Sequence, residues 1–148
     1  MKVYKIYTDG SYKPTTDQGG YAVIITKNDE VIKILHCGYK NTTNNRQELY
    51  GVLEALKYFD TPQQLEIYSD SSYVITSLNK HYVDQWITNN DEGKKNMDIW
   101  KDIVMWRNFH NVTFHWIKGH NDNKYNELAD LYANISAIVL NPIEDVEF

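Results

Sequence analysis

The chain has 148 residues, a length that suits a single domain large enough to bury its own core. Hydrophobic residues make up 42% of the chain, which excludes a disordered tail, and no apolar run approaches the roughly 20 residues that span a bilayer. The formal net charge of −5 argues against a polyanionic partner unless bound cations offset part of it. The single cysteine, Cys37, cannot form an internal disulfide and favours a reducing, cytoplasmic setting.

Segments rich in β-branched and aromatic residues predict five strands, at residues 3–9, 21–26, 31–37, 65–70 and 112–117. Apolar residues at helical spacing predict four helices, around residues 49–59, 71–78, 97–104 and 128–138. Residues 10–20 contain Pro14 and a pair of glycines, which predicts a turn-rich loop. Residues 80–95 follow no clear period and receive no helix or strand, and residues 89–93 are predicted to be a loop.

These elements follow the order βββαβααβα. Short loops join the first three strands, which predicts an antiparallel meander. The fourth and fifth strands each follow a helix, so we expect them to run parallel to the first. The sequence therefore predicts an α/β fold with a mixed five-stranded sheet, three antiparallel strands and then two parallel ones, flanked by helices. We expect one domain over residues 1–148, of which about residues 141–148 form an acidic C-terminal tail.

Four acidic residues stand at positions where ligands bind in α/β proteins. Asp9 ends the first predicted strand and Asp70 ends the fourth, so we expect their carboxylates side by side at one sheet edge. Glu48 lies near the start of the long helix, and Asp130 lies early in the last one. Four carboxylates close together raise one another's pKa values unless cations hold them. Oxygen ligands suit Mg²⁺ or Mn²⁺, and two such ions about 3.5–4 Å apart can promote phosphodiester hydrolysis.

Each of these acids also has an ordinary structural explanation. Asp70 precedes two serines and would make a good helix N-cap, and Asp9 precedes Gly10 in what could be a turn. Glu48 could face the helix dipole, and Asp130 could be a surface charge. Spacing alone does not establish that the four carboxylates converge.

Five motifs occur along the chain in a distinctive order and spacing, namely Tyr7–Ser11, Thr42–Leu49, Tyr68–Val74, Lys118–His120 and Asn126–Asp130. Together they resemble type 1 ribonuclease H, also called ribonuclease HI, and the similarity spans residue 4 to about residue 142. The resemblance implies the ribonuclease H-like fold and an endonuclease that cuts the RNA strand of an RNA–DNA hybrid. It also implies two Mg²⁺ ions, with Mn²⁺ as a substitute, and products with 5′-phosphate and 3′-hydroxyl ends.

The resemblance assigns metal binding and catalysis to Asp9, Glu48, Asp70 and Asp130. His120 resembles the mobile histidine of the family, which helps proton transfer or product release, and a pKa near neutrality suits that work. Without its flanking motif, His120 has the features of an ordinary loop histidine. No matching role falls to the other four histidines, which we interpret as structural: His36, His81, His110 and His115.

The resemblance also implies two groups of substrate contacts, the side chains of Asn44 and Asn45 and a pocket for a DNA-strand phosphate formed by Thr43 and Asn96. We also expect the backbone of Gly10 and Ser11 to approach the RNA strand, because glycine has no side chain to obstruct it. RNA differs from DNA by its 2′-OH groups, which proteins contact across a wide, shallow minor groove. Amide side chains both donate and accept hydrogen bonds and so suit those groups. Turn and capping chemistry is the alternative explanation for these polar residues, above all for Asn96.

The chain departs from the family pattern in three places. Many bacterial members carry a long basic arm, whereas residues 80–101 here hold four lysines and four acids and so have no net charge. Trp86 in that segment either contacts the DNA strand or packs in the core. Ser72 stands where a longer amide is common, and the loop from Tyr12 to Gly20 is short and lacks a Gly-Asn-Pro-Gly run. We expect weaker and less salt-dependent hybrid binding than in a basic-arm relative, because the salt slope follows the number of phosphates neutralised.

Three other functions compete with this interpretation. A DNA resolvase or an exonuclease could share the scaffold, but Asn44 and Asn45 favour a substrate with 2′-OH groups. A non-catalytic hybrid-binding module gains nothing from four clustered carboxylates. A piece of a reverse transcriptase could carry the same motifs, although the full set of elements and the start at Met1 favour a standalone protein. We expect a monomer that acts on RNA–DNA hybrid, with no membrane association and no obligate protein partner.

Overall fold

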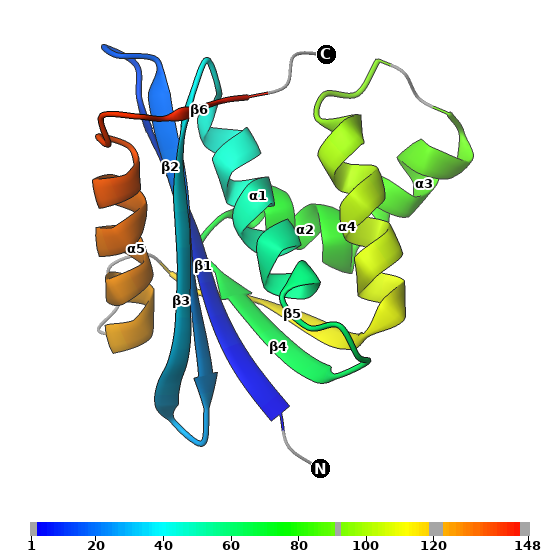
Figure 1. The fold of residues 1–148 in the computed structure, drawn as a ribbon. Coiled ribbons are helices and arrows are strands. Elements are labelled where there is room, and N and C mark those ends of the chain that lie inside the picture. The colour runs from blue at the N-terminus through cyan, green and yellow to red at the C-terminus, as the bar shows by residue number, and fades with distance from the viewer. Residues whose placement is uncertain (1–2, 91–92, 119–122, 146–148) are drawn as a thin grey trace.

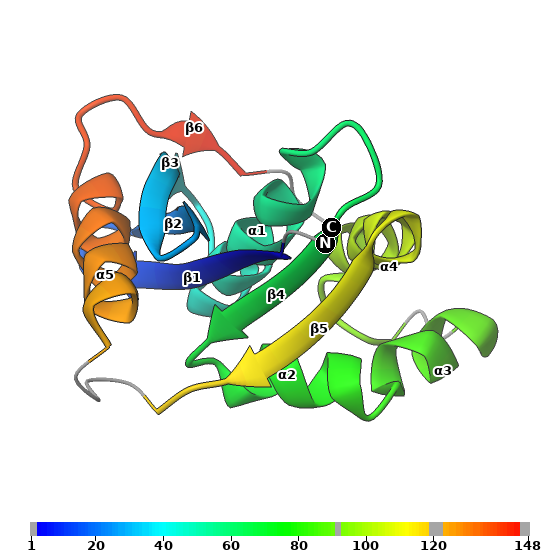
Figure 2. The ribbon, with the colours of Figure 1, turned by 90° about the horizontal axis from the view of Figure 1, so that it is seen from below.

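The computed structural model describes residues 3–90, 93–118 and 123–145. Within them the chain forms a six-stranded sheet with helices on both faces (Figure 1 and Figure 2). The strands are β1 (Val3–Lys13), β2 (Gln18–Lys27), β3 (Glu30–Lys40), β4 (Gln64–Ser69), β5 (Asn111–Trp116) and β6 (Ile143–Glu144). The helices are α1 (Asn44–Lys57), α2 (Ser72–Asn79), α3 (Tyr82–Thr88), α4 (Met97–Phe109) and α5 (Lys124–Ser136).

The sheet is mixed, which confirms the predicted fold class. Its strand order is β5-β4-β1-β2-β3-β6, with β1, β2 and β3 antiparallel and with β4 and β5 parallel to β1. The predicted count of five strands is wrong, because β6 pairs in parallel with β3 through Tyr39↔Ile143 and Lys40↔Glu144. Ile143 and Glu144 lie in the segment predicted to be an acidic tail. A strand of two residues has no periodicity that a sequence pattern could show.

The segment predicted to be a loop at residues 10–20 is instead a hairpin. β1 does not end at Asp9 but continues to Lys13, and its pairing with β2 extends to Lys13↔Gln18. A Cβ at Gly20 would lie 2.5 Å from Ser136 Cβ, so the missing side chain makes room for α5 against the sheet. Glycine at this position marks the close approach of a helix, which sequence alone does not distinguish from a turn.

The unassigned residues 80–95 contain α3, so the element order is βββαβαααβαβ. The helix has seven residues and begins after His81, whose φ of 57° is left-handed. Within the helix Val83 is buried, while Tyr82 is exposed. A helix of two turns with one buried side chain gives almost no periodic signal, which explains why the sequence did not predict it.

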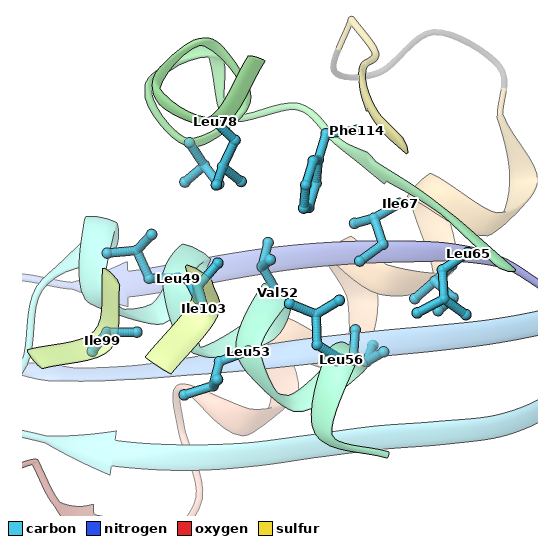
Figure 3. Packing of buried hydrophobic residues seen from close by; sticks show 14 of the residues in the cluster. Leu49, Val52, Leu53, Leu56, Leu65, Ile67, Leu78, Ile99, Ile103 and Phe114 are labelled. Atoms are coloured by element: carbon cyan, nitrogen blue, oxygen red, sulfur yellow. The ribbon is translucent and has the colours of Figure 1, made fainter. Parts of the chain in front are cut away.

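Two apolar clusters hold the helices against the two faces of the sheet. On one face, α1 lies over β1 and β2 beside α4 and buries Leu49, Val52 and Leu56 in a cluster that also holds side chains of β4 (Figure 3). Each such side chain contributes about 1.5–3 kcal/mol. On the other face, α5 packs Tyr125 and Ala129 over β1 and β2. β1 therefore lies between α1 and α5, and side chains from both helices reach it. No helix in the described part of the chain is long and apolar enough to cross a membrane.

Candidate active site

The strand register places Asp9 and Asp70 next to each other. The parallel ladder between β1 and β4 ends at the pair Thr8↔Ser69. β4 stops there, while β1 continues along β2. The next residues, Asp9 and Asp70, therefore lie side by side at the same edge of the sheet. The N-cap of α2 is Ser71, whose Oγ accepts a backbone hydrogen bond at 3.2 Å. The capping explanation for Asp70 therefore does not hold.

Glu48 reaches the same edge from α1. Thr43 caps this helix by accepting a backbone hydrogen bond at 3.1 Å, and Glu48 follows the first turn. The helix lies so close to β1 that a Cβ at Gly10 would be 2.5 Å from the Glu48 backbone nitrogen. Glycine at this position therefore allows α1 to bring Glu48 against Asp9. One ligand oxygen from each of Asp9, Glu48 and Asp70 lies within 4.8 Å of the other two.

Burial and mutual repulsion raise the pKa values in this cluster. Asp9 is 4% exposed and Glu48 is 7% exposed. Burial, followed by the negative charges of Asp70 and Asp130, raises the pKa of Asp9 to about 8, although a 2.9 Å hydrogen bond from Gly10 N opposes the shift. Burial, followed by the charges of Asp9 and Asp70, raises the pKa of Glu48 well above its usual range. A nearby cation would favour the charged forms of both groups.

Asp130 approaches the cluster from α5, on the side of β1 opposite Glu48. Its side chain is half-buried, and both its charge and a hydrogen bond between the two side chains contribute to the raised pKa of Asp9. It is not one of the three acids that share the 4.8 Å group. The structure thus brings three of the four predicted acids together and places the fourth beside Asp9.

The chemistry of the donors fits a divalent cation that prefers oxygen ligands. Glu48 Oε1 is buried and accepts no hydrogen bond from the described residues. A buried carboxylate oxygen that accepts no hydrogen bond lowers the stability of the folded protein unless a positive group binds it. Because the converging groups are all carboxylates, the site suits Mg²⁺ or Mn²⁺ better than zinc.

Thr43 and Asn96, which form the predicted phosphate pocket, both contact Arg46. Thr43 Oγ1 accepts a hydrogen bond from the Arg46 backbone, and Asn96 Oδ1 accepts one from Arg46 Nη1 at 3.2 Å. Asn96 precedes α4 with a left-handed φ of 65°, and its side chain makes no capping hydrogen bond. Both side-chain oxygens already accept, and among the described residues the Thr43 hydroxyl hydrogen and the Asn96 amide hydrogens have no acceptor, so they remain as donors. Donors at a helix N-terminus suit a phosphate.

The other predicted groove contacts lie on three elements. Asn44 and Asn45 are exposed in the first turn of α1, and Ser72 is exposed at the start of α2. Ser11 on β1 donates from Oγ to Asn134 Oδ1 of α5 at 2.8 Å. In the sequence each of these residues lies within four positions of one of the clustered carboxylates, and their contacts with substrate stay predictions.

Trp86 on α3 is half-buried. Its ring centroid lies 6.2 Å from that of Trp100, and Lys94 Nζ lies 5.0 Å from its ring centroid. Contact with a fully buried tryptophan favours the packing explanation for Trp86, and its contact with the DNA strand stays a prediction. His120 lies outside the described residues.

Sequence reasoning missed two groups beside the site. Trp116, the last residue of β5, is exposed, and its Nε1 donates to the Asp70 carbonyl oxygen at 3.1 Å. Arg46 is buried and donates to Asp145 at 2.8 Å and to Asp98 at 2.9 Å. Alternation along β5 places Trp116 on the same face as the buried Phe114, so the strand pattern gives no signal for its exposure. No local signal links Arg46 to Asp145, because they are 99 residues apart.

Comparison with known proteins gives a consistent result. The RNase H family profile matches residues 1–138. A protein named Ribonuclease H from Lachnoclostridium phytofermentans is 40% identical over 147 residues, which cover 93% of this chain and 92% of that protein. Ribonuclease HI from Synechocystis is 37% identical, with coverage of 93% and 88%. The crystal structure of LC9-RNase H1, a type 1 RNase H with the type 2 active-site motif, has the same fold, with a TM-score of 0.81, 23% identity and coverage of 93% of this chain and 72% of that chain.

Proposed function

The chain belongs to the RNase H family and is a ribonuclease H, and from this premise we propose that it cuts the RNA strand of RNA–DNA hybrids with the help of two divalent cations. The observation that carries the proposal is the convergence of Asp9, Glu48 and Asp70, whose ligand oxygens lie within 4.8 Å of one another. Buried like charges cost folding free energy, so a cluster of this kind indicates a bound cation. In this proposal the products carry 5′-phosphate and 3′-hydroxyl ends.

The four acids hold the cations from rigid elements. Asp9 lies on a central strand, Glu48 on a helix packed against that strand, and Asp130 on the helix that covers the other face, while Asp70 follows β4. Side chains on such elements keep their positions more precisely than side chains on loops. A bound pair of Mg²⁺ ions, or Mn²⁺ in their place, supplies an activated water and stabilises the leaving oxygen of a phosphodiester. In this proposal His120 takes part in proton transfer or product release.

Recognition of the hybrid rests on groups around the start of α1. Thr43 and Asn96 donate hydrogen bonds to a phosphate of the DNA strand, and Asn44 and Asn45 contact 2′-OH groups and base edges in the minor groove. This arrangement is supported by the donors that Arg46 leaves available on Thr43 and Asn96. The proposal adds further contacts from the Gly10 and Ser11 backbone, Ser72 and Trp86.

We further propose that the chain is one domain that acts as a monomer in the cytoplasm, without an obligate protein partner. The lone Cys37 and the match of the family profile over residues 1–138 support this view. Light scattering at micromolar concentration tests the monomer, and a mass of twice 17.4 kDa would overturn it.

Cleavage of an end-labelled RNA–DNA hybrid in Mg²⁺ tests the function, beside single-stranded RNA, duplex RNA, duplex DNA and an EDTA control. We expect cutting of the RNA in the hybrid alone, and none in EDTA. Ligation or polymerase extension of the fragments then reports their ends. A hybrid that binds but stays intact would favour a non-catalytic module, and cleavage of duplex DNA would favour another nuclease.

Asp70→Asn tests the assignment of the metal ligands. A neutral amide is a poorer ligand for a hard cation, so we expect an intact fold and no measurable cleavage at ordinary Mg²⁺ concentrations. Substantial turnover by this variant would contradict the assignment.

A further inference from the structure

Lys13 lies near the carboxylate cluster, although no motif points to it. Asp9, Ser11 and Lys13 alternate along β1, so their side chains share the face of the sheet that α5 covers. Lys13 is four residues beyond Asp9, which is about 13 Å along a strand that rises roughly 3.3 Å per residue.

Asn134 holds the Lys13 side chain in place. Asn134 Oδ1 accepts hydrogen bonds from Lys13 Nζ at 3.0 Å and from Ser11 Oγ at 2.8 Å. Asn134 Nδ2 donates to the main-chain oxygen of Asp130 at 2.9 Å, one helical turn earlier. The ammonium of the half-buried residue Lys13 is therefore fixed beside the turn of α5 that carries Asp130.

Within the described part of the chain, the Lys13 ammonium has no carboxylate partner, and two of its three N–H donors are unused. The chain has two arginines, and both are engaged in ion pairs. Arg46 pairs with Asp98 and Asp145, and Arg107 pairs with Asp84. A positively charged contact with the substrate at this edge is therefore made by a lysine.

We propose that Lys13 binds a phosphate of the RNA strand next to the one that is cut, and that Asn134 is the positioning residue that orients it. The inference rests on the proposed function, since it assumes that an RNA strand lies over the carboxylates. A neutral amide does not offset the positive charge of the ammonium that it holds, so that charge can attract an anionic substrate. A cation at this point also offsets the repulsion between the strand and the acidic cluster.

The test compares Lys13→Met with Lys13→Arg and with Lys5→Met. Methionine keeps the apolar stem and removes the charge, while arginine keeps the charge. Lys5 is a matched control, because it is an exposed lysine on the same face of β1, eight residues away. We expect Lys13→Met to raise the KM for hybrid about tenfold with little change in kcat, because a hydrogen bond to a charged group is lost. Lys13→Arg and Lys5→Met should retain a KM within about twofold of the wild type.

The salt dependence provides a second readout that a merely structural role would not change. Loss of one phosphate contact should reduce the slope of log KM against log salt concentration by about 0.7–0.9. A hybrid with single uncharged methylphosphonates in its RNA strand then locates the contact, since the Lys13→Met effect should vanish at one position. A wild-type KM and slope in Lys13→Met, or an equal effect in Lys5→Met, would overturn the inference.

Failure of the inference is distinguishable from failure of the proposed function. If the wild type cuts hybrid and Lys13→Met behaves like it, only the role of Lys13 is wrong. If the wild type cuts no hybrid, the proposed function is wrong. Fluorescence anisotropy with a labelled hybrid, which needs no cleavage, still decides whether Lys13→Met loses affinity and salt slope relative to Lys5→Met.

Discussion

The guanidinium of Arg46 donates two hydrogen bonds to the carboxylate of Asp145, from Nε at 2.8 Å and from Nη2 at 3.2 Å. Arg46 lies two residues before Glu48 on α1, and Asp145 follows the C-terminal strand β6. The Asp145 side chain is 1% exposed, and the hydroxyls of Tyr50 and Thr42 donate to the same carboxylate. Asp145, directly after β6, is therefore tied to the helix that carries Glu48.

Asp145→Asn should destabilise the protein by about 3 kcal/mol. The change leaves the buried guanidinium without one of its charged partners, and breaking a buried pair from one side is strongly destabilising. Urea unfolding measures the effect. Glu144→Gln is the matched control, because the neighbouring Glu144 pairs with Lys40 at 3.8 Å with both side chains more than half exposed, and such pairs contribute about 0–1 kcal/mol. Equal stabilities of the two variants would show that the buried pair contributes nothing.

The same carboxylate should make stability depend on pH in the acid range. Burial by itself would raise the pKa of Asp145, but hydrogen bonds from Arg46, Tyr50 and Thr42 outweigh it and hold the pKa below its usual range. A pKa lowered by folding contributes stability that is present above the unfolded value of about 3.9 and is lost as pH falls through the folded value. The stability difference between wild type and Asp145→Asn should therefore shrink as pH falls below about 4. A constant difference from pH 6 to the acid limb would contradict this linkage.

Asp9→Asn should stabilise the metal-free protein while removing its response to Mg²⁺. Asp9 is buried beside Glu48, and its pKa of about 8 lies far above the unfolded value of about 3.9, so folding at neutral pH has to take up a proton. A neutral amide removes this cost. We expect a higher Tm than the wild type in EDTA at neutral pH, and a rise of Tm with Mg²⁺ in the wild type alone, because a ligand that binds the folded state stabilises it. Asp60→Asn, at an exposed position, is the control. An equal Mg²⁺ response in Asp9→Asn would argue against a cation at Asp9.

Gly10→Ala should lower kcat about a hundredfold. A Cβ at this position would lie 2.5 Å from the Glu48 nitrogen and 2.8 Å from the Gln47 carbonyl carbon, both backbone atoms, so α1 has to move and Glu48 moves with it. A displacement of about 1 Å at a reacting group can cost about 10²-fold in rate. Gly51→Ala is the control, since its Cβ would come no closer than 3.3 Å to the Thr8 side chain. Full activity of Gly10→Ala would show that the spacing between α1 and β1 is not critical.

Hybrid binding should depend less on salt than in a relative with a basic arm. Residues 80–101 hold as many acids as lysines. Two of these acids form ion pairs with arginines outside the segment, Asp84 with Arg107 at 2.7 Å and Asp98 with Arg46 at 2.9 Å. Fewer neutralised phosphates give a smaller slope of log KM against log salt concentration. Measurements over about 50–200 mM salt on the two enzymes check this. Equal slopes would remove the idea.

Much of the fold followed from local patterns, and the failures have physical causes. The five longer strands and the long helix α1 were predictable, because periods of 2 and 3.6 residues report which face is buried. The glycines of residues 10–20 suggested a loop, whereas Gly20 lies in β2 where α5 approaches within contact distance. β6 and α3 bury too few side chains to show a period.

The sequence by itself determined which carboxylates to consider, because the motifs around Asp9, Glu48 and Asp70 are local and are recognised one segment at a time. Only the tertiary structure decided which charged groups satisfy one another. Asp145 holds Arg46 across 99 residues, and Asn134 holds Lys13 across 121. Contacts at such separations leave no trace in a local pattern, because they exist only once the sheet has brought α1, α5 and the C-terminal strand together.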